Sequence, residues 1–214
     1  LLCTEGVAEF NLATQKCTTL LQGSINCIYY NNNLFIGKKN EIYRYSEQTG
    51  NFDLYYQLGG GHLEVSCMHL DHKGYLWMGT TSEGVYRLQL TDKTLTHFIH
   101  KGNITSIYQD NENELWIGSW DEGLYRVKTD ERIENFKYDA KNPHGISSDF
   151  VRSCCQDNSG NIWVGTFNGL NCYDKSTNIF RNHTANGEKR DGLTNASIWC
   201  IVKDDQGTLW LGTY

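Results

Sequence analysis

The 214-residue sequence is poor in proline, in positive charge and in long apolar runs. It has one Pro, and 19 Lys and Arg residues face 25 Asp and Glu residues, for a formal net charge of −6. Nucleic-acid binding depends on clustered cationic side chains, so this balance argues against a nucleic-acid partner. No apolar stretch approaches the ~20 residues that a membrane-spanning helix needs. We therefore expect no nucleic acid and no direct membrane contact.

Aromatic residues and glycine are abundant instead, with 6 Trp, 13 Tyr, 8 Phe and 21 Gly. Aromatic side chains suit half-buried pleated surfaces, and Gly supplies the backbone conformations of turns, so the composition indicates an all-β protein. The many bulky apolar groups argue against disorder. The length suffices for a sizeable core in one large domain or two small ones.

One short string, Trp-x-Gly-Thr with an apolar residue before it, recurs along the chain. Its glycines lie 42, 39, 47 and 47 residues apart, counted from Gly37. Repeats of this length with β character predict the four-stranded blades of a β-propeller. The copies lie at residues 76–80, 115–119, 162–166 and 209–213, with a degraded copy at 34–37.

Each repeat predicts four strands, of which the first is apolar on both faces and the second carries the string. A sheet with two apolar faces is stable only between two similar sheets, which is the arrangement in a propeller. We expect each Trp to pack between neighbouring blades and each Gly to let another backbone approach closely. The residues with these structural roles are Trp77, Gly79, Trp116, Gly118, Trp163, Gly165, Trp210 and Gly212.

The repeat predicts four complete blades and two half-blades. Residues 1–22 match the third and fourth strands of a blade, and residues 198–214 match the first and second. We therefore assign residues 1–214 to one β-propeller domain, or propeller segment, with repeats of about 39–47 residues. The complementary halves are compatible with a closed five-bladed ring, and a segment of a larger propeller would have the same ends.

The strings at residues 161–174 and 74–80, and the inter-blade segment 192–198, resemble the two-component regulator propeller repeat. The resemblance extends over essentially the whole chain. In that family such repeats form the periplasmic sensor region of hybrid two-component histidine kinases, notably in gut Bacteroidetes, where they detect carbohydrate-derived ligands. The family's shared residues are architectural, so the resemblance transfers no ligand site.

The resemblance implies a non-catalytic sensor module in the periplasmic part of a membrane-anchored protein. Flanking sensor and kinase domains in the parent chain and a possible homodimer are implied with it. Two alternatives stay open, namely a propeller-fold lyase or hydrolase acting on polysaccharide, and a protein-interaction scaffold.

The eight cysteines are predicted to be structural thiols. Three of them share a repeat column with Ser106 and Ser153, and a buried free Cys behaves as a small hydrophobic residue. We expect the aligned cysteines to be buried in repeated packing positions: Cys17, Cys27, Cys67, Cys154 and Cys200.

Two histidine pairs, His69 with His72 and His97 with His100, have a spacing of three. On a strand, residues three apart face opposite sides, so the pairs are unsuited to binding one metal ion. We expect no metal and no cofactor.

The acidic residues show no catalytic pattern. A glycosidase needs two opposed carboxylates, whereas Asp121, Glu122, Asp149 and Asp191 are spread over predicted loops. The turn at residues 205–210 has part of a sialidase Asp box, but the equivalent turns replace its Asp with His or Asn, so we interpret these turns as plain hairpins. No catalytic residue is predicted.

The loops after the Trp-x-Gly-Thr strands and the inter-blade connections are expected on one face of the propeller. Trp120 and Phe167 lie in these loops, where the repeat does not require burial. An aromatic ring beside amides and charges suits a sugar, although such rings can also simply cover blade ends. The expected partner is an oligosaccharide or other small ligand, and the predicted ligand-binding residues are Trp120, Asp121, Glu122, Phe167, Asn168, Arg190 and Asp191.

Overall fold

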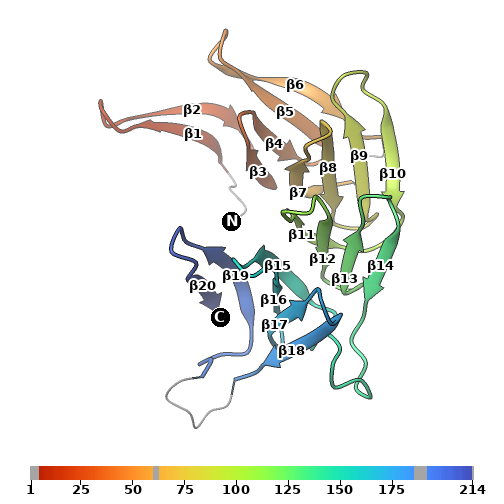
Figure 1. The fold of residues 1–214 in the computed structure, drawn as a ribbon. Helices are drawn as coiled ribbons and strands as arrows, with labels where there is room; N and C mark the ends of the chain where they lie inside the picture. Colours follow the sequence, from red (N-terminus) through yellow and green to blue (C-terminus); the bar gives the residue numbers. More distant parts are fainter. Residues whose placement is uncertain (1–4, 60–62, 186–191, 214) are drawn as a thin grey trace. The chain divides into compact units, whose positions relative to one another are not determined.

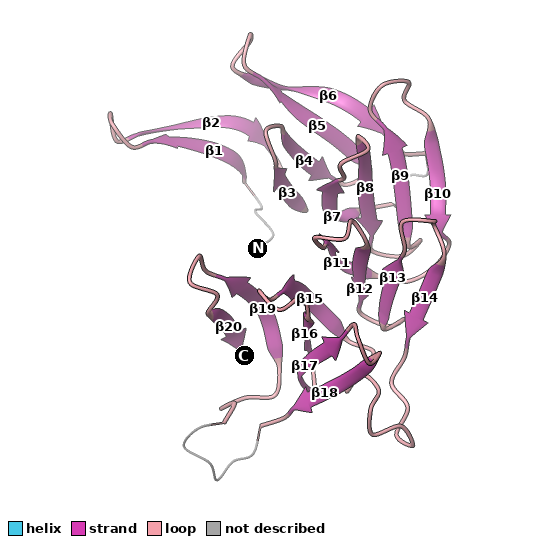
Figure 2. Ribbon diagram, in the orientation of Figure 1, coloured by secondary structure: helices cyan, strands magenta, loops and turns pink. Residues whose placement is uncertain are grey.

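The computed structural model describes residues 5–59, 63–185 and 192–213, and these residues form β-strands and no helix (Figures 1 and 2). The described part of the chain therefore contains no helix long and apolar enough to cross a membrane. The all-β prediction is confirmed.

Four sheets of four antiparallel strands follow one another along the chain, each paired in sequence order. They confirm the four predicted complete blades, whose strands alternate with short polar turns (Figure 1). Their strands are β3 (Cys27–Tyr30), β4 (Leu34–Lys38), β5 (Glu41–Ser46) and β6 (Asn51–Gln57); β7 (Val65–Leu70), β8 (Tyr75–Thr80), β9 (Val85–Gln89) and β10 (Leu95–Ile99); β11 (Ile104–Gln109), β12 (Leu115–Ser119), β13 (Leu124–Val127) and β14 (Ile133–Phe136); β15 (Val151–Gln156), β16 (Ile162–Thr166), β17 (Gly169–Asp174) and β18 (Ile179–His183).

Two two-stranded sheets complete the described fold, as predicted for the half-blades. They are β1 (Gly6–Asn11) with β2 (Lys16–Gln22), and β19 (Ile198–Lys203) with β20 (Leu209–Thr213). The contacts group the chain into two compact units, residues 1–100 and 101–214. The assignment of residues 1–214 to one domain stays a prediction.

In the first unit, the sheet β3–β6 is buried on both faces. The consecutive residues Phe35 and Ile36 are fully buried and point to opposite faces of β4. Phe35 packs with Val65 and Met78 of the sheet β7–β10, whereas Ile36 packs in a cluster that Leu21 of β2 joins. This two-sided burial is the arrangement that the apolar first and second strands predicted.

In the second unit, the sheet β15–β18 is likewise packed on two sides. Val164 belongs to a cluster with Trp116 of the preceding sheet, and Cys155 belongs to a cluster with Ile198 of β19. The ring of Trp116 is fully buried, and its centroid lies 5.3 Å from that of Tyr173 in the next sheet. The prediction that Trp116 packs between blades is confirmed.

The glycine of the repeated string faces a side chain, which corrects the expectation that another backbone approaches it. A Cβ placed on Gly118 would lie 2.6 Å from Ser106 Oγ and 2.7 Å from Val151 Cγ1. At Gly165 the nearest atoms are again a serine oxygen, Ser153 Oγ, and a β-branched side chain of the next sheet, each at 2.8 Å. The Cys/Ser column of the first strand thus occupies the space that each glycine leaves.

An aspartate at the start of each hairpin turn binds the tryptophan of the second strand. Asp110 Oδ1 accepts the backbone N–H groups of Glu112 and Glu114, both at 2.9 Å, and its Oδ2 accepts the indole N–H of Trp116 at 2.9 Å. The same three contacts recur at Asp71, Asp157 and Asp204. We call this arrangement the Asp–Trp clamp.

Some expected burial is absent. Trp210 is 62% exposed, because β19 and β20 form a two-stranded sheet and no further described strand of the second unit covers the indole. Cys17 and Cys200 are also exposed, so the expectation of buried thiols is wrong for them. Cys154 is buried, and burial raises the pKa of its thiol to about 12. The seven cysteines in the described residues are free thiols, as predicted.

The expectation that paired histidines face opposite sides is wrong for His97 and His100. Their Nδ1 atoms lie 3.2 Å apart, because the strand register shifts between His97 and Ile99. His97 also stacks on Tyr86, with ring centroids 4.1 Å apart. Within the described residues, no group of three or more His, Cys, Asp or Glu side chains forms a potential metal site.

Candidate functional site

The loops that carry the predicted ligand-binding residues lie beside the connections that precede the first strands. After β12, the backbone N–H of Trp120 donates to the carbonyl of Asn103 at 2.8 Å, and after β16 that of Phe167 donates to Phe150 at 3.0 Å. These bonds place each loop beside a connection at one end of the strands. We call the surface at this end of the sheets the connection face. Arg190 and Asp191 lie outside the described residues.

Two of the predicted polar residues form hydrogen bonds that hold this face together. Asp121 Oδ1 accepts the backbone N–H of Asn103 at 3.0 Å and the hydroxyl of Ser119 at 2.7 Å. The Asn168 side-chain amide donates to the carbonyl of Ser147 at 3.4 Å. The side chains of Asp121 and Asn168 are thus hydrogen-bonded to other groups of the protein.

Glu122 forms ion pairs with Lys101 and Lys137, each at 2.8 Å. The hydrogen bonds from these two ammonium groups hold the pKa of the Glu122 carboxyl below its usual range. The charge of Glu122 is therefore balanced locally.

The predicted aromatic residues are exposed and belong to a larger group. Trp120 is 38% exposed and Phe167 is 59% exposed. Phe150 lies between them, with its ring centroid 5.3 Å from that of Trp120 and 5.9 Å from that of Phe167. Phe150, which immediately precedes β15, was not among the residues predicted from the sequence.

Arg152 extends this group to a fourth ring. Its guanidinium carbon lies 3.9 Å from the ring centroid of Trp120 and 3.7 Å from that of Trp199, distances typical of cation–π contacts. We call Trp120, Phe150, Arg152, Phe167 and Trp199 the aromatic–arginine cluster. All five residues belong to the second unit.

Arg152 and Trp199 are positioned by β-bulges. The pairing of β15 with β16 shifts between Val151 and Ser153, and that of β19 with β20 shifts between Ile198 and Cys200. Each bulge leaves the second residue of a first strand unpaired, and bulges of this kind re-aim a side chain. Ser66 and Thr105 occupy the equivalent position in β7 and β11. The one sequence signal for Arg152 and Trp199 was their size, because Ser66 and Thr105 at the equivalent repeat positions are small and polar.

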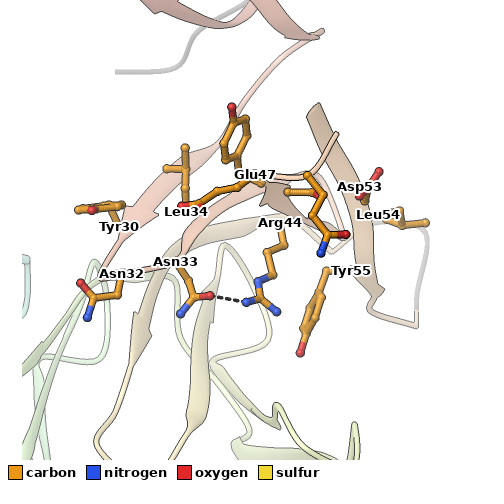
Figure 3. Close-up of a pocket in the computed structure, with 12 residues that line it drawn as sticks. Tyr30, Asn32, Asn33, Leu34, Arg44, Glu47, Asp53, Leu54 and Tyr55 are labelled. Atoms are coloured by element: carbon orange, nitrogen blue, oxygen red, sulfur yellow. Dashed lines mark hydrogen bonds between the residues drawn. The ribbon is translucent and has the colours of Figure 1, made fainter. Parts of the chain in front are cut away.

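Two hollows lie elsewhere on the described surface. One of about 780 Å³ borders the hairpin turns of the sheet β3–β6, where Figure 3 shows Arg44 bonded to the Asn33 side chain. Tyr30 and Leu54 line this hollow and are exposed. The other, of about 530 Å³, borders β16–β18 and includes Trp163 and His183, whose rings stack.

Comparison with known families gives four matches along the chain. Residues 59–82, 99–121, 145–168 and 192–214 match the model of the two component regulator propeller family. Each matched segment contains the first and second strands of a sheet. No curated protein matches the chain.

Solved structures share the fold at low sequence identity. The extracellular domains of two hybrid two component systems from B. thetaiotaomicron are 18% and 19% identical, with TM-scores of 0.59 and 0.56 over 99% of this chain. This chain spans only 37% and 34% of their lengths. A catalytically inactive virginiamycin B lyase from Staphylococcus aureus is 14% identical, with a TM-score of 0.74 over 97% of this chain and 70% of the lyase.

The solved structures support the propeller fold, and the family matches coincide with the strands that define the blades. Four segments of the chain, each holding the first two strands of a sheet, are therefore repeats of the two component regulator propeller type.

Proposed function

We propose that this chain is a non-catalytic, ligand-sensing propeller from an extracytoplasmic two-component sensor, and that it recognises carbohydrate-derived ligands. The observation that carries the proposal is the aromatic–arginine cluster, in which four aromatic side chains gather, partly exposed, on the connection face. The family repeat and the likeness to extracellular domains of hybrid two component systems support the sensor context.

Carbohydrate suits the cluster because a sugar ring presents both apolar and polar surface. Its CH groups stack on an aromatic ring, while its hydroxyls need hydrogen-bond partners at the edge of that ring. Trp120, Phe150 and Phe167 present a nearly continuous aromatic surface, with neighbouring centroids less than 6 Å apart. Arg152 supplies hydrogen-bond donors beside it.

The acidic residues of the connection face favour binding over catalysis. The Asp149 carboxylate accepts the backbone N–H of Tyr138 at 2.8 Å, and Asp121 and Glu122 are engaged as described above. A carboxylate committed to a backbone or lysine partner is poorly placed to activate water or protonate a leaving group. The alternatives of a polysaccharide lyase or hydrolase and of an interaction scaffold are outcomes of the test below.

Titration calorimetry with a panel of plant and host oligosaccharides tests the proposal. We expect at least one to bind, and we expect Trp120→Ala and Phe167→Ala to lower the affinity at least about tenfold, since each removes a stacking surface. Tyr30→Ala, at the hollow beside β3–β6, is the matched control and should bind as the wild type does.

Chromatography of the recovered sugars completes the test. Intact sugars support a sensor, whereas cleaved sugars would establish an enzyme. Loss of binding in Tyr30→Ala alone would move the site to the hollow in Figure 3. Failure of the whole panel to bind would favour the scaffold.

A further inference from the structure

We infer that the aromatic–arginine cluster recognises an anionic group on its ligand, the carboxylate or sulfate of an acidic sugar, through the guanidinium of Arg152. The inference deepens the proposed function and rests on it for the sugar part of the ligand. It starts from the unusual surroundings of this one arginine.

Arg152 differs from the other described arginines of the second unit in having no carboxylate partner. Arg126 pairs with Glu114 at 2.7 Å, Arg132 with Asp130 at 2.7 Å, and Arg181 with Asp174 at 2.9 Å. Among the described residues, Arg152 has ring contacts and neither an ion pair nor a hydrogen bond. Its guanidinium N–H groups are therefore available to a ligand.

Two indoles contact the guanidinium of Arg152. Its carbon lies less than 4 Å from the ring centroids of both Trp120 and Trp199. A guanidinium held against aromatic rings still presents its N–H donors as a rigid fork, which matches a carboxylate or sulfate with two parallel hydrogen bonds. A donor group already held in position loses less conformational entropy when the ligand binds.

The guanidinium of Arg152 is also partly desolvated, because it is partly buried. Desolvation lowers the pKa of Arg152, with no opposing contribution from a nearby acid. The group stays charged, since arginine is not deprotonated in proteins. A partly desolvated cation without a counter-ion is unfavourable, and an anionic ligand would supply that counter-ion.

The neighbouring acids do not fill this role. Asp149 precedes Phe150 in the chain but accepts a backbone N–H, and Asp121 accepts a backbone N–H and a hydroxyl. The formal net charge of −6 also gives the whole chain no general attraction for anions. Selectivity for an acidic ligand must therefore come from local contacts. In the cluster, the aromatic rings would contact the sugar and Arg152 would contact its anionic group.

Matched pairs of sugars test this inference by titration calorimetry at low ionic strength. The first pair is α-1,4-linked trigalacturonic acid and its carboxyl-reduced galactotriose. The second is N-acetylglucosamine 6-sulfate and N-acetylglucosamine, with sodium sulfate as the free anion. We expect at least one acidic sugar to bind about tenfold or more tightly than its neutral match, and added salt to weaken that preference.

Arg152→Gln should abolish the acidic preference, because the glutamine amide keeps a hydrogen-bond donor for a sugar hydroxyl but loses the charge. Arg152→Lys should retain only part of the preference, since an ammonium group keeps the charge but loses the fork. Arg132→Gln, at an exposed arginine in a hairpin turn, is the control and should behave as wild type. Thermal melting establishes that each variant is folded.

Three results would overturn the inference. Neutral sugars that bind as tightly as acidic ones, still dependent on Trp120, would refute it and leave the proposed function standing. Sodium sulfate that binds as tightly as the sulfated sugar would refute recognition of an acidic sugar. Absence of binding to every sugar would overturn the inference together with the proposed function.

Discussion

The aspartate of the Asp–Trp clamp has three bonding roles at once. Its Oδ1 closes the hairpin turn, its Oδ2 orients an indole, and at Asp110 the same Oδ2 also accepts Lys175 Nζ at 2.8 Å. The sequence shows these residues six positions before each tryptophan, at positions 71, 110, 157 and 204. Our sequence interpretation aligned the turns one residue later, on Asp205, and so found no shared acid. Spacing alone did not show which of two adjacent aspartates faces the indole.

Asp110→Asn should destabilise the protein by about 3 kcal/mol, because the buried indole N–H of Trp116 and the Lys175 ammonium lose a charged acceptor. Urea unfolding measures the loss. Asp204→Asn is the control, since it makes the same change beside the exposed Trp210 and should destabilise the protein much less. Equal losses in the two variants would contradict the role of burial.

The clamps also predict sensitivity to acid. Burial alone would raise the pKa of Asp110, but hydrogen bonds from Lys175 and Trp116 lower it overall, and Asp157 behaves alike through Trp163 and Asn161. A carboxyl whose folded pKa lies below its unfolded value of about 3.9 stabilises the fold above that value and loses this contribution as the pH falls further. Unfolding free energy should therefore fall below about pH 4, and less steeply in Asp110→Asn. An unchanged slope would contradict the assignment.

The glycine of the repeated string is a packing requirement. Gly118→Ala should destabilise the protein by about 1–3 kcal/mol, because the new methyl group would lie within 2.7 Å of Ser106 and Val151. Gly59→Ala is the control, since nothing lies within 4 Å of its Cβ position. Thermal melting compares the two, and similar melting temperatures would show that the core adjusts around the added methyl.

At the scale of strands and sheets, the periodic parts of the sequence predicted the fold well. Turn residues and alternating apolar residues marked the strands, and the terminal half-blades followed from counting. The sequence-based predictions fail where the alternation of side chains along a strand is interrupted. The shift in β10 between His97 and Ile99 brings together two histidines that strict alternation would separate. A bulge depends on how two strands pair, which the sequence of one strand does not reveal.

Neighbouring sheets of the second unit are joined by a lysine that follows β17. Lys175 Nζ contacts Asp110 and Glu112 at 2.8 Å and Glu114 at 3.0 Å, all in the turn between β11 and β12. Lys175 and Asp110 are largely buried, so this link should be stronger than a surface ion pair. The sequence offered no hint of it, because the partners lie more than 60 residues apart.

Lys175→Met should lower the unfolding free energy by about 2–4 kcal/mol, since it leaves the buried Asp110 carboxylate beside Glu112 and Glu114 without its lysine. Arg181→Met, which removes an exposed ion pair from the same sheet, should cost less than about 1 kcal/mol. Chemical denaturation of both variants gives the comparison. A larger loss in Arg181→Met would show that these carboxylates do not depend on Lys175.

For the whole molecule, the sequence predicted only part of the aromatic–arginine cluster. Trp120 and Phe167 could be identified because the repeat did not account for them. Arg152 and Trp199 stood inside the first strands and were taken for ordinary strand residues. The bulges of β15 and β19 lie at these two residues, and Arg152 contacts both Trp120 and Trp199. The cluster arises from stacking successive repeats, so no single repeat contains its pattern.

The same stacking predicts how stability is distributed. A sheet covered on two faces opens less readily than one covered on a single face. Within the first unit, β4 is buried on two faces, whereas β1 and β2 are mostly exposed; within the second, β16 is buried and Trp210 of β20 is exposed. We therefore expect backbone amides of β1, β2 and β20 to exchange hydrogen at least about tenfold faster than those of β4 and β16.

Hydrogen–deuterium exchange with mass spectrometry measures this difference strand by strand. Equal protection of terminal and internal strands would mean that the terminal sheets are covered in solution. Protection that rises with protein concentration would then identify a second copy as the cover, because association depends on concentration whereas ring closure within one chain does not. The exchange pattern therefore separates an open stack of blades, a closed ring and a dimer.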